Sequence, residues 1–401
     1  MGDNKDADAF PWHLGVFDAH CHPTDINASI AKIPDMKAQT LALMATRGED
    51  QEMVHEAAQN LGPKGTTLDK NVRVLPSFGW HPWMAHLLFD DTQFDGRTTL
   101  TQDERRKHFD SVLTPAPSDD SFVKAPEELV ALSTYLGQQR EYLLQHPLAM
   151  VGEVGIDRRF RIPTPWTAEE FQKRTMLRTG GSREGRGLSP QSVSMEHQLK
   201  VLEAQVRLAG ELERPVSVHG VQAHGALFDF FNKLWKGHEI ESKTKAKRRR
   251  AEALEAKNVA AQKDDDSPPA TEETKADTQT TTKPFPPRIC LHSYSGPATN
   301  LKQYFKYTVP SKVYVSFCME INFATNGGVS KAEECIKFLP ADRILIESDL
   351  HRAGPEMDQK LEEIARKICD LRGWSLEEGV KILGENWKSF VLGSTDKQQE
   401  K

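Results

Sequence analysis

An apolar run near the N-terminus reads Leu14-Gly15-Val16-Phe17-Asp18-Ala19-His20-Cys21-His22 and ends in two histidines. The run predicts a β-strand, and alternate residues of a strand point to the same face. The imidazoles of His20 and His22 should therefore project together, and two imidazoles on one face can hold a single metal ion. An isolated His-x-His is more often incidental, so this interpretation depends on whether the rest of the chain supplies further ligands.

Short apolar or β-branched runs recur along the chain, and most precede a stretch with helical periodicity. Strands are predicted at residues 14–19, 39–45, 72–78, 148–154, 215–219, 288–292, 312–317 and 343–348. The clearest helices are predicted at residues 49–61, 126–145, 194–212, 223–235, 297–307, 331–338, 358–372 and 376–383.

Strands that alternate with helices predict a parallel sheet, and eight such units close most naturally into an α/β barrel of the (β/α)8 TIM type. An open doubly wound sheet is the alternative fold. Against it, no Gly-x-Gly-x-x-Gly follows the first strand and the chain has no phosphate-binding P-loop. We therefore expect one barrel domain at residues 10–393, with inserted loops and flexible tails at 1–9 and 394–401.

Three polar segments look inserted into this barrel, at residues 90–121, 158–190 and 237–287. The last has low complexity, and its composition predicts disorder because it cannot bury enough apolar surface to fold. Its basic cluster, residues 243–250, is typical of a nuclear-localisation or nucleic-acid patch, or of a solvated charge run. The segment could therefore also bind a protein partner.

Bulk properties exclude several classes of protein. The 401 residues carry a formal charge of −6, so any attraction to phosphate must be local. No stretch is apolar and long enough to span a bilayer, and the acidic N-terminus is not a signal peptide. The five scattered cysteines indicate free thiols in a reducing compartment. We expect no membrane association and a cytoplasmic or nuclear location.

Metal-competent residues lie at the ends of five predicted strands: His20, His22, Glu153, His219, His292 and Asp349. In a parallel barrel these strand ends meet at one mouth. Four imidazoles and two carboxylates suit two divalent cations, with a carboxylate bridging them and open positions for water. Two such ions can bind a phosphoryl oxygen, lower the pKa of water and stabilise a leaving oxygen.

Each residue also has a structural interpretation. His219 and His292 could be satisfied core histidines, and Glu153 could belong to a turn. Asp349 could cap a helix, and His81 could simply end a strand before proline. Taken together, these readings require polar residues at five strand ends of one barrel by accident.

The motifs that carry these residues resemble those of the TatD family of metal-dependent hydrolases, and they run in family order from about residue 14 to residue 392. They are Phe17-Asp18-Ala19-His20-Cys21-His22, Gly79-Trp80-His81-Pro82, Gly152-Glu153-Val154-Gly155-Ile156-Asp157, Pro215-Val216-Ser217-Val218-His219, Leu291-His292-Ser293-Tyr294-Ser295-Gly296, Ile344-Leu345-Ile346-Glu347-Ser348-Asp349 and Glu385-Asn386-Trp387. The resemblance implies a (β/α)8 barrel and a metal-dependent deoxyribonuclease, typically one that removes nucleotides from DNA ends.

The resemblance also implies roles for the site residues. His20 and His22 would bind one metal ion, Glu153 would bridge, and His219 and His292 would complete the shell of the second ion. Asp349 would be a ligand that orients or deprotonates the attacking water, a plausible role for a carboxylate at that place. His81 would contact substrate phosphate. Magnesium is the expected ion, with manganese or zinc as alternatives.

The chain departs from the family pattern at two of these strands. After the fifth strand it reads His219-Gly220-Val221-Gln222-Ala223-His224, without the Arg and the acid that the family usually has. At the eighth it reads Glu347-Ser348-Asp349-Leu350-His351, without the usual Thr and Pro. The missing arginine could be replaced by Arg158, Arg159 or Arg161, because guanidinium groups suit phosphate. They could equally solvate a loop.

Three functions remain open at this point. The leading hypothesis is a two-metal exonuclease with DNA as substrate. The same ligand set could instead hydrolyse an amide or another ester, although related amidohydrolases often use a carboxylated lysine and none stands in the place of Glu153. The third is a scaffold of weakened activity that recruits partners through residues 237–287.

Overall fold

Eight parallel strands form the central sheet of the computed structural model, which describes residues 9–177, 185–241, 247–252, 255 and 282–393. In sheet order the strands are β1 (Phe17–Cys21), β2 (Thr40–Met44), β3 (Val74–Phe78), β7 (Met150–Asp157), β9 (Val216–Val221), β10 (Arg288–Leu291), β11 (Lys312–Phe317) and β12 (Ile344–Ile346). Past the ends of the outer strands, the Asp349 amide donates to the His20 carbonyl (3.0 Å) and the His22 amide to the Leu350 carbonyl (2.9 Å). These bonds join the two edges, so the expected barrel is confirmed and the open sheet is not.

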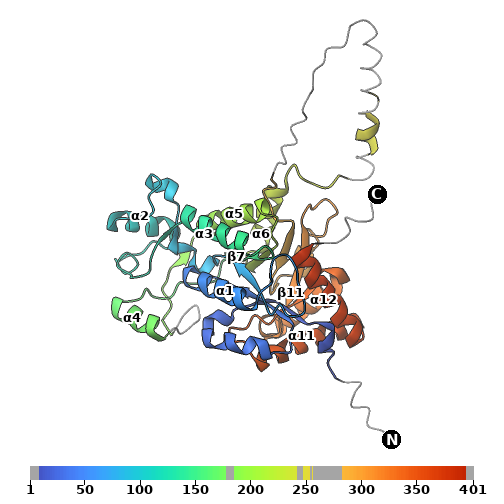
Figure 1. Ribbon diagram of the computed structural model, residues 1–401. Coiled ribbons are helices and arrows are strands. Elements are labelled where there is room, and N and C mark those ends of the chain that lie inside the picture. Colours follow the sequence, from blue (N-terminus) through green and yellow to red (C-terminus); the bar gives the residue numbers. More distant parts are fainter. Residues whose placement is uncertain (1–8, 178–184, 242–246, 253–254, 256–281, 394–401) are drawn as a thin grey trace, which may run out of the picture.

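Helices follow the strands and surround them (Figure 1). The long ones are α1 (Gly48–Leu61), α3 (Leu132–Gln145), α5 (Met195–Glu211), α6 (His224–Trp235), α10 (Asn326–Phe338), α11 (Pro355–Arg372) and α12 (Leu376–Leu392). Local sequence sets their ends. The hydroxyls of Ser194 and Ser375 cap α5 and α12 by accepting from backbone amides three residues on. Gly373 ends α11 with a φ of 68°, a conformation that glycine adopts without strain.

Two apolar layers hold the barrel together. The larger lies between the strands and the surrounding helices. The smaller takes side chains from seven of the eight strands and fills the interior, where α12 contributes Trp387, Phe390 and Val391. The Phe17 ring stacks on that of Trp387 with centroids 4.5 Å apart. Because this plug occupies the N-terminal end of the strands, the polar residues gather at the opposite, C-terminal mouth.

The insertion expected at residues 90–121 is more ordered than a polar loop. It contains η4 (Asp91–Phe94), α2 (Gln102–Val112) and β5 (Leu113–Thr114). Two short strand pairings hold this region in place. β4 (Leu88–Phe89) pairs with β6 (Val130–Ala131), and β5 pairs with β8 (Ser192–Val193). A third apolar cluster under it includes Phe89, Phe109 and Phe122. The polar composition of residues 90–121 gave no indication that these few apolar side chains would pack together.

Other helix boundaries also differ from those predicted. The helix predicted at residues 126–145 begins only at Leu132, since 130–131 form β6, and the one predicted at 297–307 is reduced to α8 (Ala298–Leu301). The segment 158–190 contains α4 (Ala168–Leu177), which the sequence did not reveal. Figure 1 shows α2 and α4 on the side of the barrel away from α11 and α12.

The predicted disorder of residues 237–287 falls largely outside the described residues, although 247–252 are helical. The tails at 1–9 and 394–401 fall outside them almost entirely. All five cysteines are buried and free, as expected. Across the described ranges, no helix is long and apolar enough to cross a membrane.

Candidate metal centre

Five barrel strands deliver the six predicted ligands to one place at the mouth. His20 lies within β1, Glu153 within β7 and His219 within β9. His22 and His292 directly follow β1 and β10, and Asp349 lies three residues after the end of β12. All but Asp349 are at most 7% exposed, and the Asp349 side chain is 15% exposed. Five of the six line a cavity of about 630 Å³: His22, Glu153, His219, His292 and Asp349.

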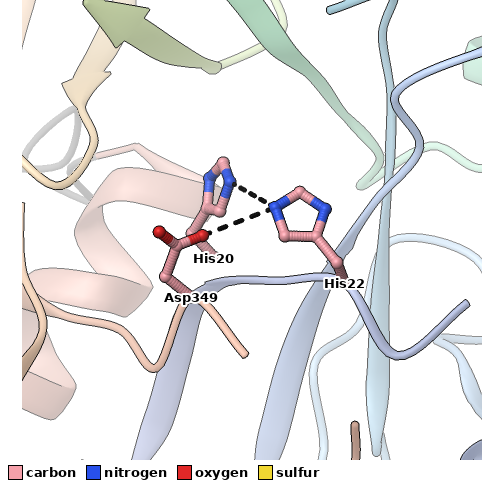
Figure 2. A group of neighbouring side chains, drawn as sticks. All are labelled: His20, His22 and Asp349. Atoms are coloured by element: carbon pink, nitrogen blue, oxygen red, sulfur yellow. Dashed lines mark hydrogen bonds and ion pairs between the residues drawn. The ribbon is translucent and has the colours of Figure 1, made fainter. Parts of the chain in front are cut away.

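His20, His22 and Asp349 form the first group of ligand atoms (Figure 2). The Nε2 atoms of the two histidines are 3.1 Å apart, and Asp349 Oδ1 is 3.5 Å from His22 Nε2. Nitrogens bound at about 2.1 Å to one ion lie roughly 3 Å apart. The spacing of the His-x-His pair therefore fits a shared cation, and the two side chains do project together.

Glu153 faces two sets of imidazoles with its two oxygens. Its Oε1 lies 2.7 Å from His292 Nε2, 2.8 Å from His219 Nδ1 and 3.1 Å from His81 Nε2. Its Oε2 lies 3.4 Å from His20 Nε2 and 3.5 Å from His22 Nε2. A carboxylate with one oxygen toward each set has the geometry that a bridging ligand needs, and the donor set suits divalent cations.

The charges at the cluster shift the pKa values of these groups in opposite directions. Burial opposes ionisation of Glu153, but the surrounding imidazoles outweigh it and hold its pKa well below its usual value. Burial also opposes protonation of His22, yet Asp349 and Glu153 raise the pKa of that imidazole to about 9. The low pKa keeps Glu153 ionised, and an ionised carboxylate among imidazoles is the kind of group that binds a divalent cation.

Glycines beside Glu153 let the strands approach closely at this end. Gly155 has a φ of 153°, and a Cβ there would overlap the carbonyl oxygen of His219. A Cβ on Gly152 would meet the Ser217 carbonyl oxygen at 2.8 Å. The glycines flanking Glu153 are thus required by the packing of β7 against β9, which brings Glu153 to His219.

Three outer residues that sequence reasoning did not assign hold the imidazoles in place. Ser217 Oγ is 2.8 Å from His20 Nδ1, Asp157 Oδ2 is 3.1 Å from His219 Nε2, and Glu347 Oε1 is 3.5 Å from His292 Nδ1. Such partners fix ring orientation and tautomer. Asp157 could have been found, because it lies four residues after Glu153 in one strand and so shares its face.

Arg47 was also missed, although it lies just beyond the end of β2. Its guanidinium lines the cavity, and its Nη2 is 3.2 Å from Asp25 Oδ1. Asp25 Oδ2 is in turn 2.7 Å from His351 Nδ1, and both residues line the same cavity. A basic residue at a strand end was the available signal, but the prediction considered only metal-binding residue types there.

One of the three predicted substrate contacts lies at the cluster, and the other two do not. His81 lies in the cluster beside Glu153, and its pKa falls to about 4 because burial disfavours the charged form. Arg158 and Arg159 are exposed and do not line the cavity. Trp83 does line the cavity: its ring stacks on Phe160 with centroids 4.2 Å apart, and its indole N–H donates to Asp157 Oδ2.

Asp349 does not cap a helix, because α11 begins at Pro355 with Gly354 as its N-cap. Its backbone has a φ of 55°, and Ser293 at the end of β10 has a φ of 41°. Non-glycine residues in this region are uncommon and concentrate at functional sites. The strain at Asp349 turns its carboxylate toward His22 (Figure 2).

The model of the TatD related DNase family matches residues 17–391. The Cut9-interacting protein scn1 of Schizosaccharomyces pombe is 35% identical over 376 residues, which are 94% of this chain and 98% of that protein. The uncharacterized deoxyribonuclease YMR262W of Saccharomyces cerevisiae is 25% identical over 392 residues. The match covers 94% of this chain and 99% of that protein.

Solved structures have the same fold at low sequence identity. An uncharacterized amidohydrolase from Saccharomyces cerevisiae superposes with a TM-score of 0.50 at 11% identity, covering 94% of this chain and 99% of its own. YJJV, a TatD homologue from Escherichia coli K12, gives a TM-score of 0.49 at 16% identity over 94% and 97% of the two chains.

Proposed function

The chain belongs to the TatD related DNase family, and we propose that it hydrolyses phosphodiester bonds of DNA, as an exonuclease, with two divalent cations at its histidine and carboxylate cluster. The family is metal-dependent. The observation that carries the proposal is Glu153, a buried carboxylate with one oxygen toward His20 and His22 and the other toward His219 and His292. Magnesium is the expected ion, with manganese or zinc as alternatives.

When bound, the cations would supply charge neutralisation at a phosphoryl oxygen and a lower pKa for water. The first would be held by His20, His22 and Asp349, and the second by His219 and His292, with Glu153 between them. Asp349 lines the cavity and is the most exposed of the six side chains, so its carboxylate is well placed to contact a water there.

Asp349 therefore accepts the proton of the water that attacks phosphorus. The new P–O bond forms as the bond to the leaving oxygen breaks, and that oxygen takes a proton from solvent. Arg47 on the cavity wall and His81 beside Glu153 bind the phosphate that is cut. Ser217 and Asp157 keep His20 and His219 aligned while this happens.

The residues lining the cavity favour phosphate over an amide substrate. Among the described lining residues there is an arginine, Arg47, and no lysine that could serve as a carboxylated bridge. Glu153 occupies the bridging position instead. A DNA substrate also agrees with the name of the Saccharomyces cerevisiae relative, an uncharacterized deoxyribonuclease.

A second candidate function is protein binding, favoured by the name of the Schizosaccharomyces pombe relative, which is a Cut9-interacting protein. We propose residues 237–287 as the binding segment. They join α6 to β10, so they leave the barrel at the end opposite the mouth and can act alongside the hydrolase. The location that suits both functions is the cytoplasm or the nucleus.

The test combines metal analysis of the purified protein with hydrolysis of single- and double-stranded DNA in magnesium or manganese. Cleavage should require metal and stop in EDTA. The variants His20→Ala, Glu153→Ala and Asp349→Ala should each lose at least a hundredfold in kcat/KM, because each removes a ligand or the base.

The control is His13→Ala, which removes an exposed imidazole outside the mouth and should keep full activity. Full activity of Asp349→Ala, or cleavage that persists in EDTA, would refute the metal mechanism. Hydrolysis of amide or ester substrates in place of DNA would leave the metal cluster in use but reject the nuclease.

A further inference from the structure

A second cavity, of about 540 Å³, adjoins the metal cluster, and we call it the insertion pocket. Its walls include residues of η3 (Pro82–Leu87), of residues 105–130 and of residues 162–174, together with Arg186. Arg47 and Met84 line both this pocket and the cavity at the metal cluster. The two spaces are therefore neighbours, and the volume of the second lies in the range of small-ligand pockets.

Aromatic rings and guanidinium groups face one another in the insertion pocket. The Arg186 guanidinium lies 4.1 Å from the centroid of the Trp166 ring. Arg174 lies 5.6 Å from the Phe171 centroid and 5.9 Å from that of Trp166. Nucleobases stack both on aromatic rings and on guanidinium planes, with little dependence on sequence.

Two buried polar side chains in the same walls keep one atom each without a hydrogen-bond partner among the described residues. The atoms are Nδ1 of His86, a residue only 6% exposed, and Oε2 of Glu127, whose Oε1 lies 3.6 Å from Arg186 Nη1. Burial lowers the pKa of His86 to about 3, so its ring is neutral near pH 7. Buried polar atoms normally find partners, and the edge of a nucleobase offers N–H donors for the carboxylate and donors or acceptors for the imidazole.

We propose that the insertion pocket binds one unpaired nucleobase of the DNA strand whose phosphate lies at the metal cluster. This inference rests on the proposed function. The Trp166 ring, with Arg186 on one face, stacks on the base, Glu127 and His86 bond to the edge of the base, and Arg47 contacts the phosphate between the two sites. A base must leave its duplex to enter, so the pocket selects single strands and frayed ends.

The experiment uses the full chain and two oligodeoxynucleotides with the same number of phosphates, one with bases and one with abasic tetrahydrofuran residues throughout. Hydrolysis is measured with magnesium, and binding is measured by fluorescence anisotropy in EDTA. The wild type should prefer the strand with bases in both assays. In Trp166→Ala this preference should fall about tenfold, since one stacked base contributes about 1–3 kcal/mol.

Conservative and control variants separate base binding from loss of structure. Trp166→Phe should retain most of the preference, and Glu127→Gln should lower it severalfold. The control is Tyr307→Ala, an aromatic residue that is 70% exposed outside the pocket, and it should behave as wild type.

The outcomes distinguish this inference from the proposed function. A wild type that treats both strands alike, or a Trp166→Ala protein that keeps the preference, overturns the base pocket even when DNA is cleaved. If neither strand is cleaved, the proposed nuclease fails, and the anisotropy measurement still decides: a base preference that Trp166→Ala removes supports the pocket, and no preference overturns it.

Discussion

Asp157 holds the His219 imidazole from the side opposite the metal cluster. Its Oδ2 is 3.1 Å from His219 Nε2 and accepts the indole N–H of Trp83 at 2.7 Å. Burial disfavours the charged carboxylate, but His219 and Trp83 outweigh it and lower the pKa of Asp157 to about 2. The ionised group therefore leaves Nδ1 of His219 aimed at Glu153, 2.8 Å away.

Replacing Asp157 by Asn tests this positioning role. An amide keeps the size of the side chain but loses the charge that orients the ring, so metal affinity should fall about 10- to 100-fold. The measurement is a metal titration of the variant by calorimetry, alongside kcat and KM on DNA. Ser192→Ala, a substitution in an exposed hydroxyl, is the control.

Added metal should restore kcat in Asp157→Asn, because the ligands themselves remain. A merely structural role would lower the unfolding temperature without changing the metal concentration needed for half-maximal activity. That result would remove Asp157 from the metal centre.

At the scale of elements, two histidine side chains attach neighbouring helices to η3. Nε2 of His108, on α2, lies 2.8 Å from the carbonyl oxygen of His86. Nε2 of His197, on α5, lies 2.9 Å from the carbonyl oxygen of Ala85. Both carbonyls belong to η3, which follows β3. The imidazoles must be neutral to be buried, so this attachment depends on pH.

Acid should weaken the attachment in a defined range. Burial lowers the pKa of His108 to about 4, whereas histidine in an unfolded chain titrates near 6.5. Between these values the unfolded chain binds more protons, so stability falls as pH falls from about 6.5 to 4, and His108 has no such effect above that range. The loss for this residue is on the order of 3 kcal/mol.

The variant His108→Gln keeps an N–H donor for the His86 carbonyl and cannot titrate. Its free energy of unfolding, measured in urea at pH 7 and pH 4, should differ less between the two pH values than that of the wild type. His13→Gln, which changes an exposed histidine, is the control. An unchanged pH dependence in His108→Gln would show that the buried histidine is not responsible.

At the scale of the whole molecule, the two proposed functions belong to opposite ends of the barrel. The predicted ligands lie at the C-terminal ends of the strands, and the apolar plug around Trp387 fills the barrel interior below them. Residues 237–287 leave α6 and return to β10, which places both of their attachment points away from the mouth. The insertion pocket, by contrast, lies beside the mouth because its segments extend from the β3 and β7 ends.

Deletion of residues 243–282 tests this separation. The shortened chain should cleave DNA with a kcat/KM within about twofold of the full chain, since both attachment points of the segment lie away from the mouth. It should fail to capture a protein partner that the full chain retains. Activity and partner capture are measured on the same preparations. A nuclease defect with normal metal content would place the segment at the active site instead.

The repeating pattern of apolar strands and amphipathic helices determined the barrel. Each element could be recognised from its own residues, because apolar side chains recur about every 3.6 residues in a helix and every two in a strand. All eight strands were located within a few residues, and the six ligand residues lie together where the barrel topology required. The sequence could do this because parallel strand ends always converge at one mouth.

Only the tertiary structure decided which atoms face which. The two oxygens of Glu153, the Asp157 support of His219 and the position of Arg47 depend on contacts between residues far apart in the chain. The order in residues 90–131 depends on a few apolar anchors that pack against distant elements, and local composition does not record such packing. The insertion pocket exists only because two separate insertions meet beside the mouth, a juxtaposition that no single stretch of sequence contains.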